Sequence, residues 1–165
     1  MIKVDITANN VASSYRVPVI FGDSILGLKW NSGAKYTVIS VEVFNSDISV
    51  EDIESIRQYC DDHSKRREQF ISASGHTFEG YLVTAHEVTI GNTVLSDFYY
   101  YLVVENQRDV ALLGYDFTDC CKSFHDPHRD IIVTEFDDEG YGTVYSGAMD
   151  SDEVIAFIDS LSAGE

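Results

Sequence analysis

The chain has 165 residues, 44% hydrophobic and 24% charged, which fits one soluble globular domain with a core of its own. The formal net charge of −17 disfavours nucleic acid and anionic membrane surfaces as partners, because both attract clustered Lys and Arg. No apolar run approaches the roughly 18 residues of a membrane span, and no secretory signal is visible at the N-terminus.

The first part of the chain is predicted to form strands and then a helix. Alternating apolar and β-branched residues predict strands at Lys3–Ala8, Tyr15–Phe21, Ser24–Trp30 and Lys35–Val41. A helix is predicted at Val50–Cys60, because Ser49 can cap its first turn and apolar residues recur at helical spacing. The charged segment Asp61–Glu68 is expected to be a loop.

The remainder of the chain is predicted to return to strands and to end on a helix. Strands are expected at Gln69–Ser74, Phe78–Ile90, Thr93–Val104 and Ala111–Leu113, with a hairpin turn at Gly91-Asn92. A short helix at Phe117–Phe124, a hairpin of Ile131–Phe136 with Gly142–Ser146, and a helix at Asp152–Leu161 capped by Ser151 follow. These elements predict an all-β fold, a barrel or closed sandwich with a few short helices.

Two turns carry residues that an ordinary connection does not need. The first, Asn31-Ser32-Gly33-Ala34, lies between a predicted strand and the β-branched run Thr37-Val38-Ile39. Its small residues let another group approach the backbone closely. The second, Gly114-Tyr115-Asp116-Phe117, directly follows the apolar run Ala111–Leu113. Between these turns lies a hairpin whose tip is Ser72-Ala73-Ser74-Gly75-His76.

Both turns, in this order and with the Gly-containing tip between them, resemble the retropepsin-like aspartic proteases, single-domain relatives of the retroviral enzyme. That family has Asp-Thr/Ser-Gly-Ala before Thr-Val-Ile, and later two apolar residues, Gly, any residue, Asp/Asn and Phe/Leu. The resemblance covers about Val17 to Phe124. It implies a closed acid-protease barrel in one domain over residues 1–165, with a core at about 15–125 and a C-terminal hairpin–helix extension over 126–165.

The resemblance also implies a mechanism. Two copies of the first turn would meet in a homodimer, and each would supply one carboxylate; like charges so close share one proton, which splits the apparent pKa values of the pair. The ionised member would activate a water that attacks the peptide bond. Ser32 would bond across the dimer axis, and Gly33 would leave room for the substrate backbone. Substrate binding is assigned to Lys29, Ala34, Lys35, Ser74, Gly75 and His76, and a structural role to Leu113, Gly114 and Asp116.

The position of the catalytic aspartate holds Asn31. An amide cannot share or give up a proton near neutral pH, so we expect this form to be inactive. Either an active endopeptidase has been inactivated by an Asp-to-Asn change, which is the interpretation we favour, or the protein is a natural pseudoprotease that binds or scaffolds peptides. A structural alternative is that Asn31 is an ordinary residue of an Asx turn.

Other departures from the family limit what the resemblance implies. Lys35 and Tyr115 stand where retroviral enzymes place an acidic residue and an arginine, so that ion pair is absent, and the long C-terminal segment suggests a different dimer interface. Lys29, two residues before Asn31, is predicted on the same side of its strand and would favour an acidic substrate side chain; the alternative is a lysine extended into solvent. His76 and His86 are predicted on the hairpin that would cover the site, either touching substrate or simply exposed.

Three further chemistries find weak support. The cysteines are Cys60, Cys120 and Cys121, an odd count with two adjacent, so we expect reduced thiols in a cytoplasmic protein. Cys121 with His125 and His128 would suggest a metal site, but no CxxC pair supports it, and Pro127 indicates a turn. Ser32 lacks the nucleophile elbow of serine hydrolases. We therefore expect no cofactor and no metal, with a peptide or protein as substrate and no nucleic acid or membrane partner.

Overall fold

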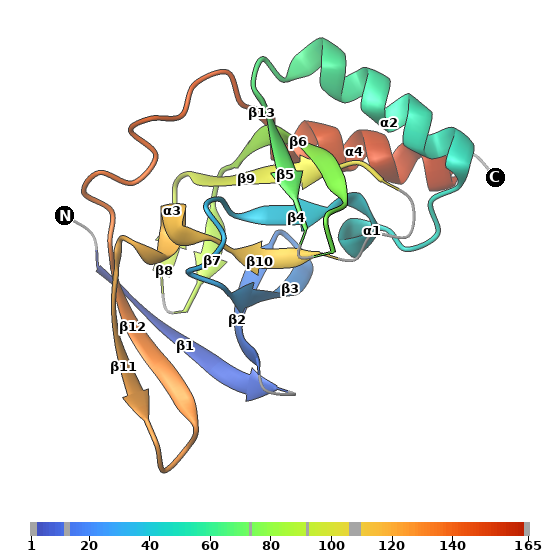
Figure 1. The fold of residues 1–165 in the computed structure, drawn as a ribbon. Helices are drawn as coiled ribbons and strands as arrows, with labels where there is room; N and C mark the ends of the chain where they lie inside the picture. The colour runs from blue at the N-terminus through green and yellow to red at the C-terminus, as the bar shows by residue number, and fades with distance from the viewer. Residues whose placement is uncertain (1–2, 12–13, 73, 92, 106–109, 164–165) are drawn as a thin grey trace. The chain divides into compact units, whose positions relative to one another are not determined.

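The computed structural model describes residues 3–11, 14–72, 74–91, 93–105 and 110–163. The chain forms two units, each assembled from three separate stretches (Figure 1). The first contains residues 1–37, 86–98 and 111–144, and the second contains residues 38–85, 99–110 and 145–165. One domain with a core at about 15–125 stays a prediction. Ala73 and Asn92, which the sequence places in turns, lie outside the described residues.

The sheet of the first unit is mainly antiparallel. Its strands are β1 (Lys3–Val11), β2 (Ser14–Phe21), β3 (Ser24–Trp30), β7 (Val88–Ile90), β8 (Thr93–Leu95), β10 (Ala111–Leu113), β11 (Cys121–Asp126) and β12 (Ile131–Asp137). They follow the order β11-β12-β1-β2-β3-β10, and β7 pairs with both β2 and β8. Only β10 runs parallel to its neighbour β3 in this order, and this brings the two predicted turns to the same end of adjacent strands.

The core of the first unit follows the alternation of its strands. Val17, Val19 and Leu28 are fully buried on one face of the β2–β3 pair, while the residues between them are more exposed. Phe117, in helix α3 (Tyr115–Thr118), stacks on Phe136 of β12 with ring centroids 4.5 Å apart. This packing fixes α3 against the sheet next to the second turn.

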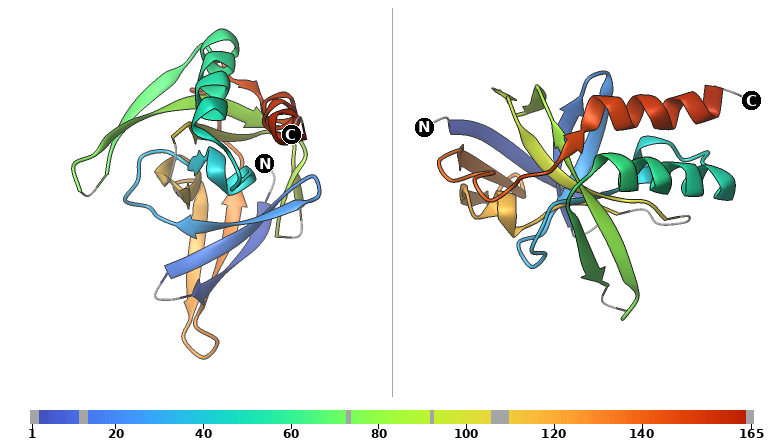
Figure 2. Two further views of the ribbon diagram at one scale, coloured as in Figure 1. Left: turned by 90° about the vertical axis from the view of Figure 1, so that its right-hand side faces the viewer. Right: turned by 90° about the horizontal axis from the view of Figure 1, so that it is seen from above.

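The second unit combines a small sheet with the longer helices. Its strands are β4 (Val38–Ser40), β5 (Arg67–Ile71), β6 (Thr77–Ala85), β9 (Phe98–Val103) and β13 (Met149–Asp150), and its helices are α1 (Val41–Phe44), α2 (Val50–His63) and α4 (Ser151–Ala163). The strand order is β4-β9-β6-β13, with β5 paired to β6. Helices α2 and α4 lie side by side (Figure 2), and Tyr59 stacks on Phe157 at 4.6 Å.

The starts of α2 and α4 show how local sequence sets a helix boundary. Ser49 forms the predicted cap: its hydroxyl accepts from the Asp52 amide at 3.2 Å, and the Asp52 carboxylate accepts from the Ser49 amide at 3.4 Å. At α4 the cap is Asp150, whose carboxylate accepts from the Asp152 amide at 2.8 Å. Ser151 is instead a buried helical residue whose hydroxyl lies 2.7 Å from the Tyr100 hydroxyl.

The predicted closed barrel is not observed. The structure is mostly β, as expected, but in neither unit do the described strands return to pair with the first strand of their order. The predicted loop Asp61–Glu68 is also wrong, because α2 continues to His63 and β5 begins at Arg67. In that last helical turn Tyr59 and His63 stack at 3.9 Å, and the Tyr59 carbonyl lies 2.8 Å from Nδ1 of His63, which favours helix over loop.

The region after the second turn also differs from the prediction. Helix α3 ends at Thr118, and Cys121–Asp126 is a strand rather than part of a helix. This strand, and not Gly142–Ser146, is the hairpin partner of β12, with the register Cys121↔Phe136 to Asp126↔Ile131. The Asp126 carboxylate accepts from the His128 amide at 3.0 Å and thereby closes the hairpin turn around Pro127.

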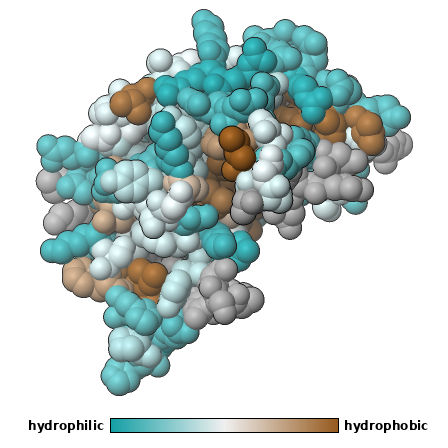
Figure 3. Space-filling model, in the orientation of Figure 1, coloured by the Kyte–Doolittle hydropathy of each residue, from teal (hydrophilic) through white to brown (hydrophobic). Residues whose placement is uncertain are grey.

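The surface is largely hydrophilic in the view of Figure 3, with isolated hydrophobic residues. Exposed large apolar side chains are scattered along the chain and include Ile25, Val50, Ile71, Phe124 and Val144. None of the helices in the described ranges has both the length and the apolar character needed to cross a membrane.

The second unit buries several groups that ionise only at high pH. Burial raises the pKa of the Cys60 thiol from its ordinary value of 9.0 to about 12, and the neighbouring Asp61 carboxylate adds to the effect. Burial also raises the pKa of Tyr81 to about 12, helped by its hydrogen bond to Asp61. The contribution of each group to stability is fully present below the pKa that the group has in the unfolded chain. This contribution is lost as the pH rises toward the pKa of the group in the folded protein.

We therefore expect the free energy of unfolding to fall above about pH 9, by up to about 1.4 kcal/mol per pH unit for each such group. Urea unfolding at pH 8, 9, 10 and 11 measures this slope. In the Cys60→Ala variant the slope between pH 9 and 11 should be shallower, whatever the variant's stability at pH 8. A free energy of unfolding that stays constant to pH 11 would contradict the expectation.

Candidate active site

Asn31 lies where the chain leaves β3, next to the end of β10. Trp30 pairs with Leu113 in the parallel register of these strands, and the Asn31 amide donates to the Leu113 carbonyl at 3.0 Å. The Asn31 side-chain oxygen Oδ1 accepts from the Gly33 amide at 3.1 Å, and its carbonyl accepts from the Ala34 amide at 3.2 Å. Asn31 therefore forms an Asx turn, which was the structural alternative for this residue. An aspartate at this position would accept the same hydrogen bond from the Gly33 amide through a carboxylate oxygen.

The two predicted turns are joined by main-chain hydrogen bonds. The Ala34 carbonyl accepts from the Tyr115 amide at 2.6 Å, and the Lys35 carbonyl accepts from the Asp116 amide at 3.1 Å. A Cβ at Gly114 would lie 2.2 Å from the carbonyl carbon of Tyr36, so only glycine allows this approach. The structure thus brings together Asn31, Gly33, Ala34, Lys35, Leu113, Gly114 and Asp116 from the sequence-predicted set.

Thr37 connects the two turns through its side chain. Its hydroxyl donates to the Asp116 carboxylate at 2.9 Å and accepts from the Gly114 amide at 3.1 Å, and the residue is fully buried. The same Asp116 oxygen accepts from the Phe117 amide at 2.9 Å, at the start of α3. Thr37 belongs to the first motif in the sequence, but no role was predicted for it. The hydroxyl at the start of an otherwise apolar run is the signal that could have indicated one.

Replacing Thr37 with valine is expected to lower the free energy of unfolding by about 3 kcal/mol, because it leaves the buried Gly114 amide without its partner and removes one donor from the half-buried Asp116 carboxylate. Thr37→Ser is the matched control: it keeps the hydroxyl and removes one methyl group, which should cost about 1 kcal/mol. Urea unfolding of the two variants measures the difference. Equal stability of the two would show that the hydroxyl does not hold the turns together.

The side chains around the turn differ in exposure. Ser32, Gly33 and Lys35 are exposed, whereas Asn31 and Ala34 are half-buried. Within the described part of the chain the Ser32 hydroxyl has no hydrogen-bond partner. The Lys35 ammonium lies 5.2 Å from the centroid of the Tyr36 ring, and Tyr115 is 52% exposed. The turn therefore presents its small residues and its serine outward.

The second unit holds the hairpin that the sequence assigns to covering the site. Strands β5 and β6 pair with Phe70 opposite Phe78, and the two rings stack at 5.5 Å. At the tip the Ser72 amide donates to the His76 carbonyl at 2.8 Å, and Gly75 has a φ of +87°. Nε2 of His76 lies 3.3 Å from the Glu105 carboxylate. Ser74, Gly75 and His76 are all exposed.

His86 is not part of that hairpin. It lies beyond the end of β6, within the stretch 86–98 of the first unit. Its Nδ1 lies 2.8 Å from the Asp97 carboxylate and 3.2 Å from the Ser96 carbonyl. These contacts hold the segment between β8 and β9 close to the start of β7, so the predicted place of His86 on the covering hairpin is wrong.

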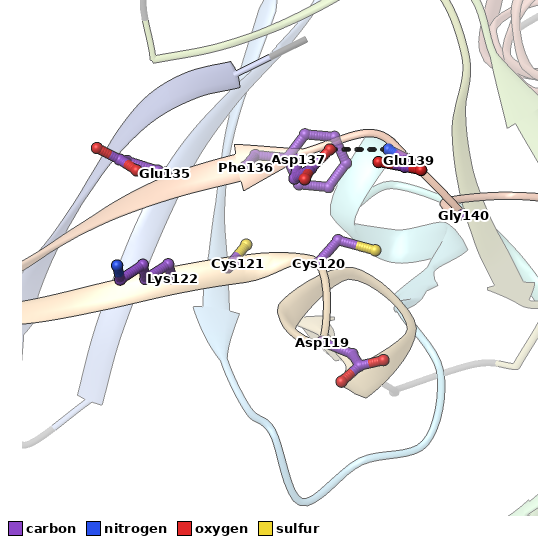
Figure 4. Close-up of a pocket in the computed structure, with 9 residues that line it drawn as sticks. All are labelled: Asp119, Cys120, Cys121, Lys122, Glu135, Phe136, Asp137, Glu139 and Gly140. Carbon is purple, nitrogen blue, oxygen red and sulfur yellow. Dashed lines mark hydrogen bonds between the residues drawn. The ribbon is translucent and has the colours of Figure 1, made fainter. Parts of the chain in front are cut away.

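The cysteine-rich segment lines a cavity of about 390 Å³ in the first unit (Figure 4). Its walls come from Asp119, Cys120, Cys121, Lys122, Glu135, Phe136, Asp137, Glu139 and Gly140. All three cysteines are free. Burial raises the pKa of the Cys121 thiol to about 11, so it is protonated at neutral pH. The described residues contain no group of three or more His, Cys, Asp or Glu that could hold a metal.

No known protein-family model matches this sequence, and no curated protein matches it. Among solved structures, the chain is similar to the crystal structure of a retropepsin-like aspartic protease from Rickettsia conorii. The TM-score is 0.53 at 14% sequence identity, and the match covers 81% of this chain and 98% of that one. At this identity the likeness establishes the fold alone. The chain therefore has the fold of a retropepsin-like aspartic protease.

Proposed function

We propose that this chain is the inactivated form of a homodimeric aspartic endopeptidase, in which each subunit supplies one Asn31 turn. The observation that carries the proposal is the joining of two distant motifs around Asn31. The turn at Asn31 is held to the Gly114–Asp116 segment by main-chain bonds and by the Thr37 hydroxyl. An Asx turn at Asn31 would not by itself require glycine at position 114, packed against the backbone of Tyr36.

The chemistry requires a carboxylate where Asn31 stands. In a dimer of the active form, two aspartates would share one proton; the ionised one would take a proton from water, and the protonated one would donate to the developing oxyanion. Asparagine has nearly the same shape but neither accepts nor releases that proton. The exposed Ser32 hydroxyl would bond across the dimer axis. The β5–β6 hairpin, with Ser74, Gly75 and His76 at its tip, would cover the peptide and exclude water.

The second candidate is a pseudoprotease that binds or scaffolds peptides without cutting them. The amide at position 31 favours it, because both subunits of a homodimer would carry the same amide. In both candidates an extended peptide would be bound as an added strand, and no cofactor is needed. We infer a cytoplasmic protein from its free thiols.

The dimer proposed here would not use the terminal strands in the retroviral manner. Strand β1 pairs within the chain with β12, from Lys3↔Asp137 to Asn9↔Ile131. The N-terminal strand thus already has a partner on that edge. We propose that the subunits contact each other through the turn regions instead, which keeps the two Asn31 residues close.

Two measurements test this proposal. Sedimentation should detect a dimer of the Asn31 protein at micromolar concentration, and a strict monomer at high concentration would exclude a shared site. If the Asn31→Asp protein cleaves members of a peptide library and pepstatin inhibits this cleavage, the result supports the proposal of an aspartic endopeptidase. Retained peptide binding without any cleavage by that variant supports the pseudoprotease.

A further inference from the structure

Two cationic side chains face each other on the exposed side of the β2–β3 pair. Arg16 and Lys29 are directly opposite in the antiparallel register, and both are exposed, whereas the neighbouring Val17 and Leu28 are buried. Directly opposite residues of two strands point to the same face of the sheet. The Arg16–Lys29 pair therefore presents two positive charges to solvent on one face.

This arrangement is unfavourable in the free protein. Like charges directly opposite in a sheet repel each other. The chain has 28 acidic residues against 11 Lys and Arg, yet no described acidic side chain forms an ion pair with either member. Arg16 donates from Nη1 to the Gly27 carbonyl at 3.1 Å. Among the side chains that the structure describes, none compensates the two positive charges.

The Arg16 side chain lies over Gly27, next to the chain that leads to Asn31. A Cβ at Gly27 would lie 3.7 Å from Cδ of Arg16, so the Arg16 stem runs over a residue that has no side chain. Lys29 is two residues before Asn31. Strand β3 ends at Trp30, between these two residues, which are about 7 Å apart along the chain. A peptide extended past Asn31 would therefore bring a neighbouring side chain over the pair.

We propose that the Arg16–Lys29 pair is the subsite that binds an acidic side chain of the peptide. This proposal rests on the proposed peptide-binding function and names its substrate class. A carboxylate bridging the two cations would remove their repulsion, and the Arg16 guanidinium can bind it through two parallel N–H groups. The overall charge of −17 repels acidic peptides in general, so the pair would act as a local and position-specific attraction.

The test uses the Asn31 protein, which should bind peptides without cutting them. Fluorescence anisotropy compares library peptides that differ only by Glu or Gln at one position. We expect a preference of about five-fold for Glu at one position at low salt, decreasing in 0.5 M NaCl. Lys29→Gln and Arg16→Gln should each reduce the preference, and Lys29→Glu, whose carboxylate would pair with Arg16 across the two strands, should abolish it. Lys122→Gln, which removes an exposed charge on β11, is the matched control and should leave it unchanged.

A second readout is independent of peptides. Because Lys29→Gln removes the repulsion and no described contact, its midpoint of thermal unfolding should be at or above that of the parent chain. A clear fall would contradict the premise that the pair is unfavourable. An unchanged Glu preference in both Gln variants, with peptides still bound, would overturn the subsite while sparing the proposed function. Failure of every library peptide to bind would overturn both.

Discussion

The Asn31→Asp protein is expected to hydrolyse peptides at least about 10³-fold faster than the Asn31 protein, because the substitution supplies the general acid and base that an amide cannot replace. The Asn31 side-chain oxygen already accepts from the Gly33 amide at 3.1 Å, so a carboxylate fits the existing turn. The rate with a fluorogenic peptide should follow a bell-shaped pH profile, since one carboxyl must be ionised while the other is protonated.

A mixing experiment distinguishes a shared site from a site within one chain. Adding excess Asn31 protein to a fixed amount of the Asn31→Asp protein converts active homodimers into mixed dimers with one carboxylate. Activity per aspartate chain should then fall toward zero. Asn31→Ala serves as the control for the aspartate, and it should be as inactive as the parent chain. Activity that is unaffected by the added Asn31 protein would show that a single chain contains the whole site.

Replacing Gly114 with alanine is expected to lower the free energy of unfolding by about 4 kcal/mol or more, enough to prevent folding of a marginal domain. The new Cβ would lie 2.2 Å from the Tyr36 carbonyl carbon, 2.3 Å from the Tyr36 oxygen and 2.8 Å from the Thr37 amide nitrogen. All three are backbone atoms between two hydrogen-bonded groups, the Lys35 carbonyl and the Thr37 hydroxyl, so they cannot move aside without disturbing those bonds. Soluble yield and urea unfolding measure the loss.

Gly27→Ala is the matched control in the same unit. Its Cβ would meet Cδ of Arg16 at 3.7 Å, an ordinary van der Waals contact, so we expect a change within about 1 kcal/mol. If Gly114→Ala were no less stable than Gly27→Ala, the close approach of the two turns would be refuted. The framework proposed for the active site would then be refuted as well.

Features that depend on neighbouring residues were predictable from the sequence. The cap at Ser49 was predicted because a capping hydroxyl and the amide it binds are separated by only a few residues, and the structure extends it to a capping box with Asp52. A hairpin of Thr84–Ile90 with Thr93–Leu95 was predicted from Gly91-Asn92, and the structure pairs Val88–Ile90 with Thr93–Leu95. The mostly β structure was predicted from the strand-like runs, and the retropepsin-like fold from the order of the two motifs. The predicted closure into a barrel is not observed.

Features that depend on distant residues were decided only by the tertiary structure. The segment after α3 has no local preference strong enough to choose helix or strand, and its pairing with β12 made it a strand. Thr37 acquires its role only because the fold brings Gly114 and Asp116 to its hydroxyl across more than 70 positions of sequence. Arg16 faces Lys29 only through the register of β2 with β3. Local turn and cap chemistry is encoded within a few residues, whereas strand pairing and buried hydrogen bonds depend on which distant segments pack together.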